Sequence, residues 1–378
     1  MGFCSDWIPY IYHSHARLAP VLRSEDYLAK RVLCPKSSFL HGEHTTLELF
    51  DDVLVQRMNN TIVTRVEQLT NRHLGPLDYI PAVRNYWMPN VERVNHEQVS
   101  LFRLTYKVLC KTKITCNATH QYVLNNRIYP RPHFKFMAHT SPDAWQDAHD
   151  LFGAEELARL MTLRSYDAFL HAFGNTGSKR PHVVADCWTR HPEWPRLVLV
   201  GNPREMENYE AFRAKGWPPN VEFHEFVDVR TLRRLQIENG VALCSTAQEG
   251  YGHFINDGRS MGSVVLTTNH PPMNEFVRED GFDGILIGYD REPQHFDHQA
   301  LWREFNSSVD ISGTTVCDGV QRIISMSVEE KERMGGEARK SYELDTALME
   351  ANMKELLAEV WEHLQRDKSS LHRARYVY

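Results

Sequence analysis

From about Tyr166 onward, short apolar runs alternate with polar and amphipathic stretches, and this rhythm restricts the fold more than any other feature of the sequence. Six runs have the length and composition of buried strands: 168–173, 197–200, 221–226, 241–244, 264–267 and 284–287. The stretches that begin at Pro181, Thr231 and His253 predict helices between them. This alternation predicts an α/β fold with a parallel, doubly wound sheet that binds ligands at the carboxyl ends of its strands.

The first 150 residues contain further strand-like runs, at 52–55, 61–64, 79–80 and 106–110, but no Gly-rich loop follows any of them. They predict a second Rossmann-like domain without a phosphate site of its own. The stretch from Pro130 to Pro142 is rich in Pro, His and aromatic residues, which indicates a domain junction. We therefore expect a first domain over 1–155, a second over 160–340 and a C-terminal segment over 341–378.

The C-terminal segment has the pattern of a long helix. Ser327 and Glu330 match a capping box, in which the hydroxyl and the carboxylate each accept a hydrogen bond from a free backbone N–H. Apolar residues then recur on one helix face: Met349, Met353, Leu356, Leu357, Val360 and Leu364. This face is expected to pack on a core.

Length, charge and cysteine usage narrow the class of protein. The 378 residues suffice for two domains, and a net charge of -6 without a basic run excludes the electrostatic pattern of a nucleic-acid binder. No apolar stretch approaches the roughly 18 residues of a transmembrane helix, and residues 1–15 lack a signal-peptide pattern. We expect a cytoplasmic protein without a transmembrane segment, whose seven cysteines are buried thiols.

The segment from Ser245 to Asp257 carries the most informative group of residues. Glu249 follows a predicted strand, and Gly250 and Gly252 let the backbone approach a ligand closely before the chain enters a helix. Free N–H groups at a helix start attract anions, so this segment predicts a phosphate-facing surface. Asp257 lies about one turn inside the helix, so the two carboxylates are expected to reach different parts of one extended ligand.

This segment resembles the E-x7-E signature of retaining glycosyltransferases of the GT-B fold, especially family 4 (glycosyl transferases group 1), and stands here as E-x7-D. The resemblance implies two Rossmann-like domains that face each other across a cleft, the first for the acceptor and the second for the donor. It also implies a last helix that crosses back to the first domain. By position, Glu249 would contact the donor sugar as a catalytic residue, and Asp257 would contact the ribose.

The same resemblance extends to neighbouring residues. Tyr251 and His253, within the signature, become donor-binding candidates. The turn at 270–275 is similar to the family's donor-side turn, whose backbone amides contact the sugar and the diphosphate. Asn274 and Glu275 are therefore candidates as well.

A second loop supports a diphosphate ligand. The segment 171–179 is interpreted as a flexible loop after the first strand of the donor domain, and Gly174 and Ser178 belong to it. It resembles the family loop in which a basic residue after the first glycine and a later lysine bind the diphosphate. Lys179 matches the later lysine and would stabilise the leaving charge, whereas Asn175 stands where a basic residue is usual, and Arg180 would substitute. The alternative is a surface Lys-Arg pair.

Metal chemistry is not expected, because the sequence contains no Asp-x-Asp pair of the kind that holds a divalent ion on a sugar nucleotide. His41 and His44 lack a third ligand, so a surface or core role is favoured for them. Lys111 and His120 are weaker landmarks, for which buried-strand and satisfied-histidine interpretations are preferred.

The resemblance implies a retaining glycosyltransferase that moves a sugar from a nucleoside-diphosphate-sugar donor to a glycan or another hydroxyl acceptor, and the absence of Asp-x-Asp predicts that it is metal-independent, with no bound cofactor. Two alternatives stay open at this point. One is another sugar-nucleotide enzyme of the same fold, a hydrolase or an epimerase. The other is a non-catalytic binding protein that keeps only the donor fold, and Asn175 and Asp257 are the features that favour it.

Overall fold

The computed structural model describes residues 64–67, 84–88, 102–103, 105–290 and 308–374 of the chain. The chain divides into two compact units, each described here by itself. The first unit consists of 1–139, 299–302 and 345–378, and the second of 140–298 and 303–344. The division between residues 139 and 140 falls inside the stretch from Pro130 to Pro142, and residues 140–155 belong to the second unit.

The first unit contains a parallel sheet in the order β1-β2-β3-β4, with one helix, α5, between β3 and β4. Its elements are β1 (Thr64–Glu67), β2 (Arg84–Trp87), β3 (Lys107–Cys110), α5 (Lys113–Asn125) and β4 (His133–Phe136). The predicted strand at 106–110 is confirmed, while the runs at 52–55 and 79–80 lie outside the described residues. β2 and β4 were not predicted, because neither Arg84–Trp87 nor His133–Phe136 forms an apolar run.

The second unit is built on a six-stranded parallel sheet in the order β10-β9-β8-β5-β6-β7. Its strands are β5 (Ser165–Gly174), β6 (Arg196–Gly201), β7 (Val221–His224), β8 (Asn239–Cys244), β9 (Val264–Thr268) and β10 (Ile285–Ile287). Counted from β5, this is the strand order 3-2-1-4-5-6 of a dinucleotide-binding Rossmann fold. The predicted doubly wound sheet is therefore confirmed, with a strand in each of the six apolar runs.

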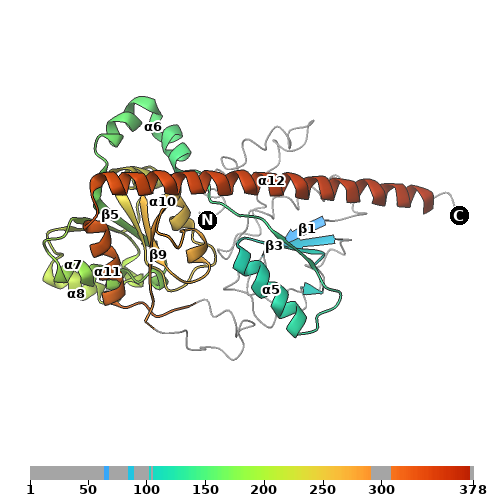
Figure 1. Cartoon of the computed structure of the whole chain (residues 1–378), viewed down its shortest axis with the longest axis horizontal. Coiled ribbons are helices and arrows are strands. Elements are labelled where there is room, and N and C mark those ends of the chain that lie inside the picture. The colour runs from blue at the N-terminus through green and yellow to red at the C-terminus, as the bar shows by residue number, and fades with distance from the viewer. Residues whose placement is uncertain (1–63, 68–83, 89–101, 104, 291–307, 375–378) are drawn as a thin grey trace. The chain divides into compact units, whose positions relative to one another are not determined.

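Helices cover both faces of this sheet (Figure 1). The second unit's helices are α6 (Ala144–Met161), α7 (Pro181–Arg190), α8 (Tyr209–Lys215), α9 (Val229–Glu238), α10 (His253–Ser260), α11 (Gly313–Ile324) and the first part of α12 (Val328–Ala374). On one face, α7 and α11 bury Trp188 and Val320 against Phe169 and Leu243. On the other face, α9 and α10 contribute to a separate core. Alternate residues of each strand thus pack into opposite layers.

Two turns of 3-10 helix matter for the site, η3 (Gly177–Lys179) after β5 and η4 (Pro203–Glu205) after β6. A third, η5 (Met273–Glu275), follows β9. All three come directly after strands of the parallel sheet. They therefore lie at the sheet edge formed by the carboxyl ends of the strands.

The long helix α12 contributes to both units. It begins after the predicted capping box, where the Ser327 N–H donates to Glu330 at 2.8 Å and the Glu330 N–H donates to Ser327 Oγ at 3.2 Å. From Asp345 onward it belongs to the first unit, where Met349 and Val360 are buried with Leu109. The prediction of a last helix that returns to the first domain is confirmed.

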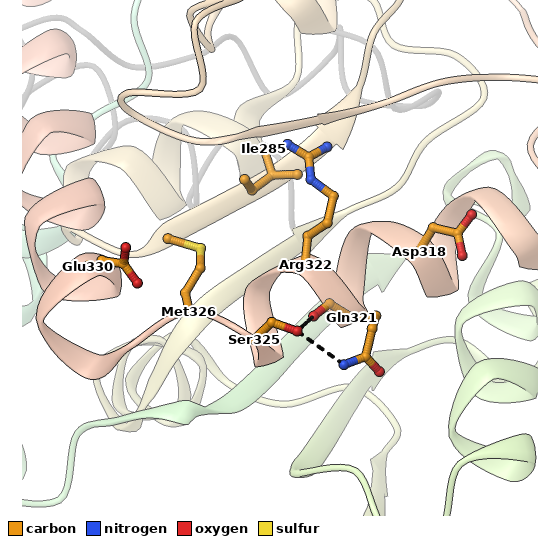
Figure 2. A pocket seen from close by; sticks show the side chains of 7 residues that line it. All are labelled: Ile285, Asp318, Gln321, Arg322, Ser325, Met326 and Glu330. Atoms are coloured by element: carbon orange, nitrogen blue, oxygen red, sulfur yellow. Dashed lines mark hydrogen bonds between the residues drawn. The ribbon is translucent and has the colours of Figure 1, made fainter.

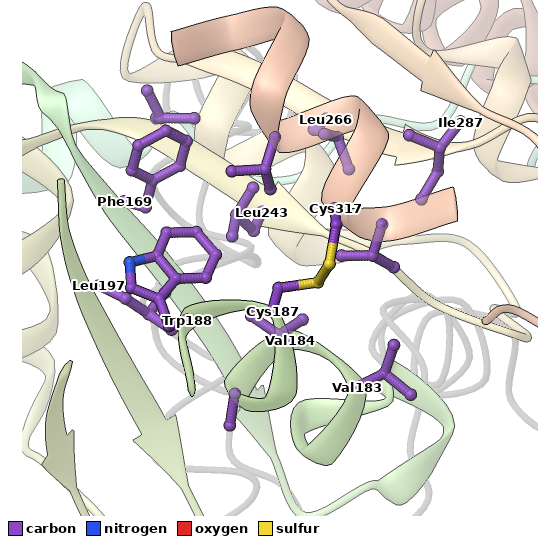
Figure 3. Packing of buried hydrophobic residues seen from close by; sticks show 14 of the residues in the cluster. Phe169, Val183, Val184, Cys187, Trp188, Leu197, Leu243, Leu266, Ile287 and Cys317 are labelled. Carbon is purple, nitrogen blue, oxygen red and sulfur yellow. A yellow bond between two sulfur atoms is a disulfide. The ribbon is translucent and has the colours of Figure 1, made fainter. Parts of the chain in front are cut away.

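The prediction that the cysteines are thiols is wrong for four of them. Cys110 is bonded to Cys116, and Cys187 to Cys317, the second pair lying 130 residues apart in the chain. Figure 3 shows the second disulfide within the core between α7 and α11. Sequence spacing reveals neither pairing, because only the folded chain brings the Cα atoms within 5.2 and 5.5 Å.

Cys244 is a buried thiol, as expected, and Cys4 and Cys34 lie outside the described residues. Among the helices that the structure describes, none is both long and apolar enough to cross a membrane.

Candidate functional site

The second sheet has a topological switch point between β5 and β8. β5 pairs with β6 on one side and with β8 on the other, so the chain leaves these two adjacent strands in opposite directions. In open parallel sheets, ligands bind in the crevice at the carboxyl ends of such strands. The loops after β5 and β8 carry most of the two segments that the sequence selected, 171–179 and 245–257.

The loop after β5 begins later than the sequence suggested. Residues 171–174 belong to β5, and the loop itself spans 175–180. His171 is fully buried in the strand, where its Nδ1 lies 2.8 Å from the carbonyl oxygen of Leu243. Burial lowers the pKa of His171 to about 4, so its imidazole is neutral at physiological pH. It belongs to the sheet core rather than to the loop.

The loop after β6 holds the β5 loop in place. The backbone N–H of Asn202 donates to the Gly174 carbonyl at 2.8 Å, and the Gly177 N–H donates to the Glu205 carboxylate at 3.0 Å. A Cβ atom at residue 177 would lie only 3.0 Å from the Glu205 carbonyl oxygen, so a larger residue would force the Glu205 backbone to shift by a few tenths of an ångström. The exposed side chain of Asn175 accepts a hydrogen bond from Asn202.

Sequence reasoning missed Asn202 and Glu205. Both follow β6, so an inspection of every strand end would have found them.

The loops that carry Lys179 and Glu249 are joined at the switch point. The Ala247 N–H donates to the Ser178 carbonyl at 2.7 Å, which joins the two loops next to these residues. Burial raises the pKa of the Glu249 carboxyl, while the positive charge of Lys179 and a hydrogen bond from Thr246 oppose this rise. The ammonium of Lys179 also lies 5.7 Å from the centre of the Phe254 ring.

Arg180 is placed differently from Lys179. Its backbone adopts the left-handed conformation, with φ 53°, directly before Pro181 starts α7. Its guanidinium lies 3.8 Å from the carboxylate of Asp310, a separation that leaves a loose ion pair at the protein surface.

The loop after β8 turns into α10 at Gly252. This residue has φ +99°, and a Cβ atom there would lie 2.8 Å from Ile255 Cδ1, so only glycine fits. The helix start then presents backbone N–H groups next to Glu249 and Gly250. The Tyr251 ring is 3% exposed and contacts the Phe276 ring at 5.1 Å, which makes it part of the core.

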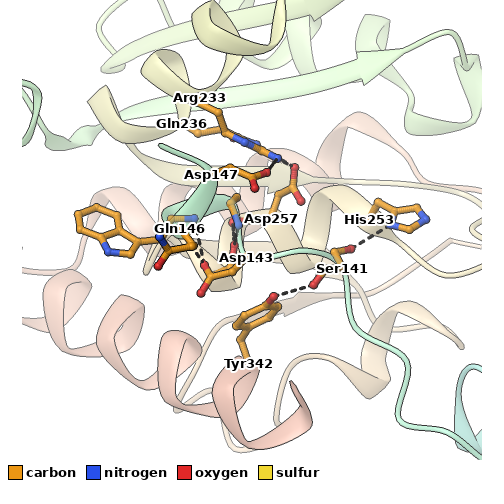
Figure 4. Close-up of polar contacts among 12 residues, drawn as sticks. Ser141, Asp143, Gln146, Asp147, Arg233, Gln236, His253, Asp257 and Tyr342 are labelled. Carbon is orange, nitrogen blue, oxygen red and sulfur yellow. Dashed lines mark hydrogen bonds and ion pairs between the residues drawn. The ribbon is translucent and has the colours of Figure 1, made fainter. Parts of the chain in front are cut away.

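His253, the first residue of α10, lies 2.9 Å through Nδ1 from Ser141 Oγ (Figure 4). This contact joins the helix start to the segment that precedes α6.

Asp257 lies on α10 in a buried ionic cluster. Its Oδ2 accepts hydrogen bonds from Arg233 Nη1 at 2.9 Å and from Gln236 Nε2 at 3.2 Å, both on α9. Arg233 Nη2 donates to Asp147 of α6 at 2.9 Å. The sequence offered no signal for this cluster, since its members come from three helices that are distant in the chain.

The turn after β9 completes the strand-end loops. Met273 is buried beneath it, and Asn274 donates from its side chain to Asn269 Oδ1 at 3.1 Å. Glu275 is exposed, and the His270 ring contacts the ring of Tyr289. The predicted site residues thus lie in or next to the loops that follow β5, β8 and β9, which are neighbouring strands of one sheet.

The remaining candidates that the structure describes lie in the first unit. In the first unit, Lys111 is buried after β3, and His120 is exposed on α5 with its ring 5.0 Å from that of Phe134. His41 and His44 lie outside the described residues. Within the described part of the chain, no group of three or more His, Cys, Asp or Glu side chains could hold a metal ion.

A surface pocket of about 560 Å³ lies elsewhere on the second unit, beside β10 (Figure 2). It is lined by Ile285, Asp318, Gln321, Arg322, Ser325, Met326 and Glu330. None of the residues that the sequence selected for donor binding lines it.

Comparison with solved structures gives the class of fold. The chain is similar to a glycosyltransferase from Rickettsia africae ESF-5, with 12% identity, coverage of 85% of this chain and 84% of that one, and a TM-score of 0.58. It is also similar to the α,α-trehalose 6-phosphate synthase of Burkholderia multivorans, with 11% identity, coverage of 85% and 76%, and a TM-score of 0.56.

A further similar structure is HepE from Anabaena in complex with UDP and glucose, with 12% identity, coverage of 73% and 72%, and a TM-score of 0.51. No family model and no curated protein matches the sequence. The chain therefore has the GT-B class of fold, with two parallel α/β units.

Proposed function

We propose that this chain is a glycosyltransferase that moves a sugar from a nucleoside-diphosphate-sugar donor to a glycan or another hydroxyl acceptor. The observation that carries this proposal is the hydrogen bond from the Ala247 N–H to the Ser178 carbonyl, which joins the loops of Lys179 and Glu249 at the switch point of a Rossmann-ordered sheet. A cation beside a helix start suits a diphosphate, and a nearby carboxylate suits sugar hydroxyls. The similar fold of HepE, which was solved with UDP and glucose, supports this ligand class.

The roles follow from the chemistry of each group. Lys179 and the N–H groups at the start of α10 stabilise the diphosphate as it leaves, Glu249 accepts hydrogen bonds from the donor sugar, and Asp257 accepts them from the ribose. The turn at Asn274 and Glu275 contacts the sugar and the diphosphate. The resemblance of segment 245–257 to the GT-B signature further assigns the predicted first domain, 1–155, to the acceptor and the predicted second domain, 160–340, to the donor.

The proposed reaction retains the anomeric configuration and requires no metal ion. The bond between the anomeric carbon and the diphosphate oxygen breaks, and its electron pair stays on the diphosphate. The acceptor oxygen forms its bond to the same face of that carbon, and its proton passes to the leaving phosphate. No protein nucleophile takes part, so Glu249 acts on the donor sugar without forming a covalent bond.

A cytoplasmic location stays a prediction, and the two disulfides weigh against it. Disulfides form and persist mainly in oxidising compartments and are rare in the cytosol. Fractionation of cells that express the protein, with trapping of free thiols at lysis, would decide between the two environments.

The test of the function has two stages. A thermal-shift screen with nucleoside diphosphates and their sugars identifies the donor, because a ligand at 100 times its dissociation constant adds about 2.7 kcal/mol of stability. Transfer is then measured with that donor and a panel of glycan acceptors. Glu249→Gln should lower turnover roughly 10²–10³-fold, which is the loss expected when one transition-state contact is removed. The control Glu329→Gln, at an exposed residue of α12, should leave turnover unchanged.

Other outcomes would contradict the proposal in distinguishable ways. Release of free sugar without transfer to any acceptor would indicate a hydrolase. Donor binding without turnover would indicate a binding protein that keeps only the fold. Unchanged turnover in Glu249→Gln would remove this carboxylate from the site.

A further inference from the structure

The buried ionic cluster around Arg233 joins three helices of the second unit. The Arg233 residue is 2% exposed, and its guanidinium lies between the carboxylates of Asp257 and Asp147, as Figure 4 shows. Gln236 bridges the same groups, since it accepts from Arg233 at 2.7 Å and donates to Asp257 at 3.2 Å. α6, α9 and α10 therefore meet at one guanidinium.

Such a cluster fixes geometry more than it adds stability. Removing ions from water costs several kcal/mol per ion, so a buried arginine persists only where its partners are well placed. Two donors from α9 meet the same Asp257 oxygen, which restricts the rotation of that carboxylate. The orientation of Asp257 is thus set by α9, and α6 in turn holds Arg233 through Asp147.

The length of the aspartate side chain makes this orientation matter. Asp257 is one methylene shorter than the glutamate of the signature that it resembles, so it cannot adjust its reach by bending a longer stem. Its distance to a ribose then depends on where the backbone of α10 stands and on the angle of its carboxylate. Both are fixed by the contacts with α9 and α6.

We propose that Arg233 is a positioning residue for nucleotide binding, which holds the Asp257 carboxylate in the orientation that recognises the ribose hydroxyls. The inference rests on the proposed function and adds α6 and α9 to the donor site. Arg233 itself need not touch the nucleotide. Asp147 supports it from the opposite side of the guanidinium.

A second ionic contact in the same region provides a matched control. Arg339 on α12 donates to both carboxylate oxygens of Asp143 at the start of α6, at 2.6 and 2.7 Å, and to the Ser260 carbonyl at the end of α10. Like Arg233 it joins α6 to α10, but it does so through Asp143 and the Ser260 carbonyl. A purely structural role predicts similar effects for the two arginines.

The experiment compares Arg233→Lys with Arg339→Lys. UDP, GDP and ADP are tested by calorimetry against the unaltered full chain, and the tightest binder is then compared with its 2′,3′-dideoxy analogue. We expect the unaltered protein to prefer the ribonucleotide roughly ten-fold or more, the value of a hydrogen bond to a charged group. Arg233→Lys should remove most of this preference while affinity for the dideoxy analogue changes little, whereas Arg339→Lys should keep the preference.

The remaining outcomes separate the two proposals. If the unaltered chain binds none of the three nucleotides, the proposed function fails and this inference fails with it. If the nucleotide binds without a preference for ribose, or if Arg233→Lys keeps the preference, the positioning role alone is wrong and the cluster is structural. Should Arg233→Lys fail to fold, Asp147→Asn leaves the Arg233–Asp257 pair intact and should lower the preference by about two- to three-fold.

Discussion

The two units of this chain share a parallel α/β architecture but fix the loops at their strand ends by different means. In the second unit, hydrogen bonds and charges hold the loops after β5 and β8, through Ser178, Ala247 and Glu205. In the first unit, a disulfide between Cys110 and Cys116 closes the segment after β3. In the proposed function, these polar contacts hold the loops that carry the charged groups of Lys179 and Glu249, whereas a covalent bond supplies rigidity without charge.

The disulfide of the second unit extends this comparison. Cys187 and Cys317 join α7 to α11 in the core, away from the polar loops, and the guanidinium of Arg190 lies 3.0 Å from Cys317 Sγ. α7 begins directly after Arg180 and α11 begins shortly after Asp310, and these two residues form the loose ion pair at the surface. The second unit therefore uses its covalent bond to hold the scaffold and its polar contacts to shape the site.

The largest predicted effect separates the two disulfides. Cys187 and Cys317 close a loop of 130 residues, and Cys110 and Cys116 a loop of 6. The chain-entropy relation then gives about 5 kcal/mol of stabilisation for the long loop and about 2 kcal/mol for the short one. Paired Cys→Ala variants of each disulfide, unfolded with denaturant under oxidising conditions, measure both losses.

Comparison under reducing conditions provides the control. Once the unaltered chain is reduced, each variant should differ from it only by the packing of the lost sulfur atoms. Equal losses for the two pairs under oxidising conditions would show that loop closure does not govern their contributions.

The success of sequence reasoning also differs between the units. In the second unit, each strand is an apolar run next to a turn, so local periodicity predicted β5 to β10, and a contiguous segment led to Glu249 and the loop before α10. In the first unit, β2 and β4 are four residues long and have no comparable flanking pattern. Length alone does not explain the difference, because β7 and β10 are no longer than four residues and were predicted. Without a flanking pattern, β2 and β4 are specified by their neighbours in the sheet, which a local pattern does not contain.

The parts of the site that escaped prediction depend on distant pairs. Arg233 and Asp257 are 24 residues apart, and Arg233 and Asp147 are 86 apart. Each is ordinary in its own helix, where a charged residue normally faces solvent. Only the packing of α6, α9 and α10 turns them into a cluster, and the same holds for the paired cysteines.

A smaller predicted effect is the pH-dependent loss of folding stability caused by the Glu249 carboxyl. Burial raises the pKa of Glu249 above its unfolded value, so its contribution to stability is present at low pH and is lost as pH rises through the folded pKa. Glu249→Gln removes this loss. The variant should be more stable than the unaltered chain at pH 7, and the difference should vanish below about pH 4, where the unfolded carboxyl is also protonated.

Denaturant unfolding at a series of pH values measures this difference in stability. The control Glu329→Gln, at an exposed residue of α12, should change the stability little. A Glu249→Gln variant that is less stable at pH 7 would mean that the attraction of the Lys179 charge stabilises the carboxylate by more than its burial destabilises it.

The smallest predicted effect is that of metal removal on sugar transfer. Charge that develops on a leaving diphosphate must be stabilised, and the proposed function assigns this role to Lys179 and the first turn of α10, which follow the strands of the switch point. The sequence contains no Asp-x-Asp pair that would hold a divalent ion on the donor. Transfer is measured after exhaustive chelation and again with added magnesium or manganese, and both rates should agree within about two-fold. Activity that disappears with chelator and returns with metal would contradict this assignment of the diphosphate site.

The variant Lys179→Ala gives the matched comparison. If the ammonium of Lys179 takes the place of a metal ion, turnover should need Lys179 and should not need the metal. If the Lys179→Ala variant kept full activity after chelation, neither group would stabilise the leaving charge, and the polar loops of the second unit would need another role.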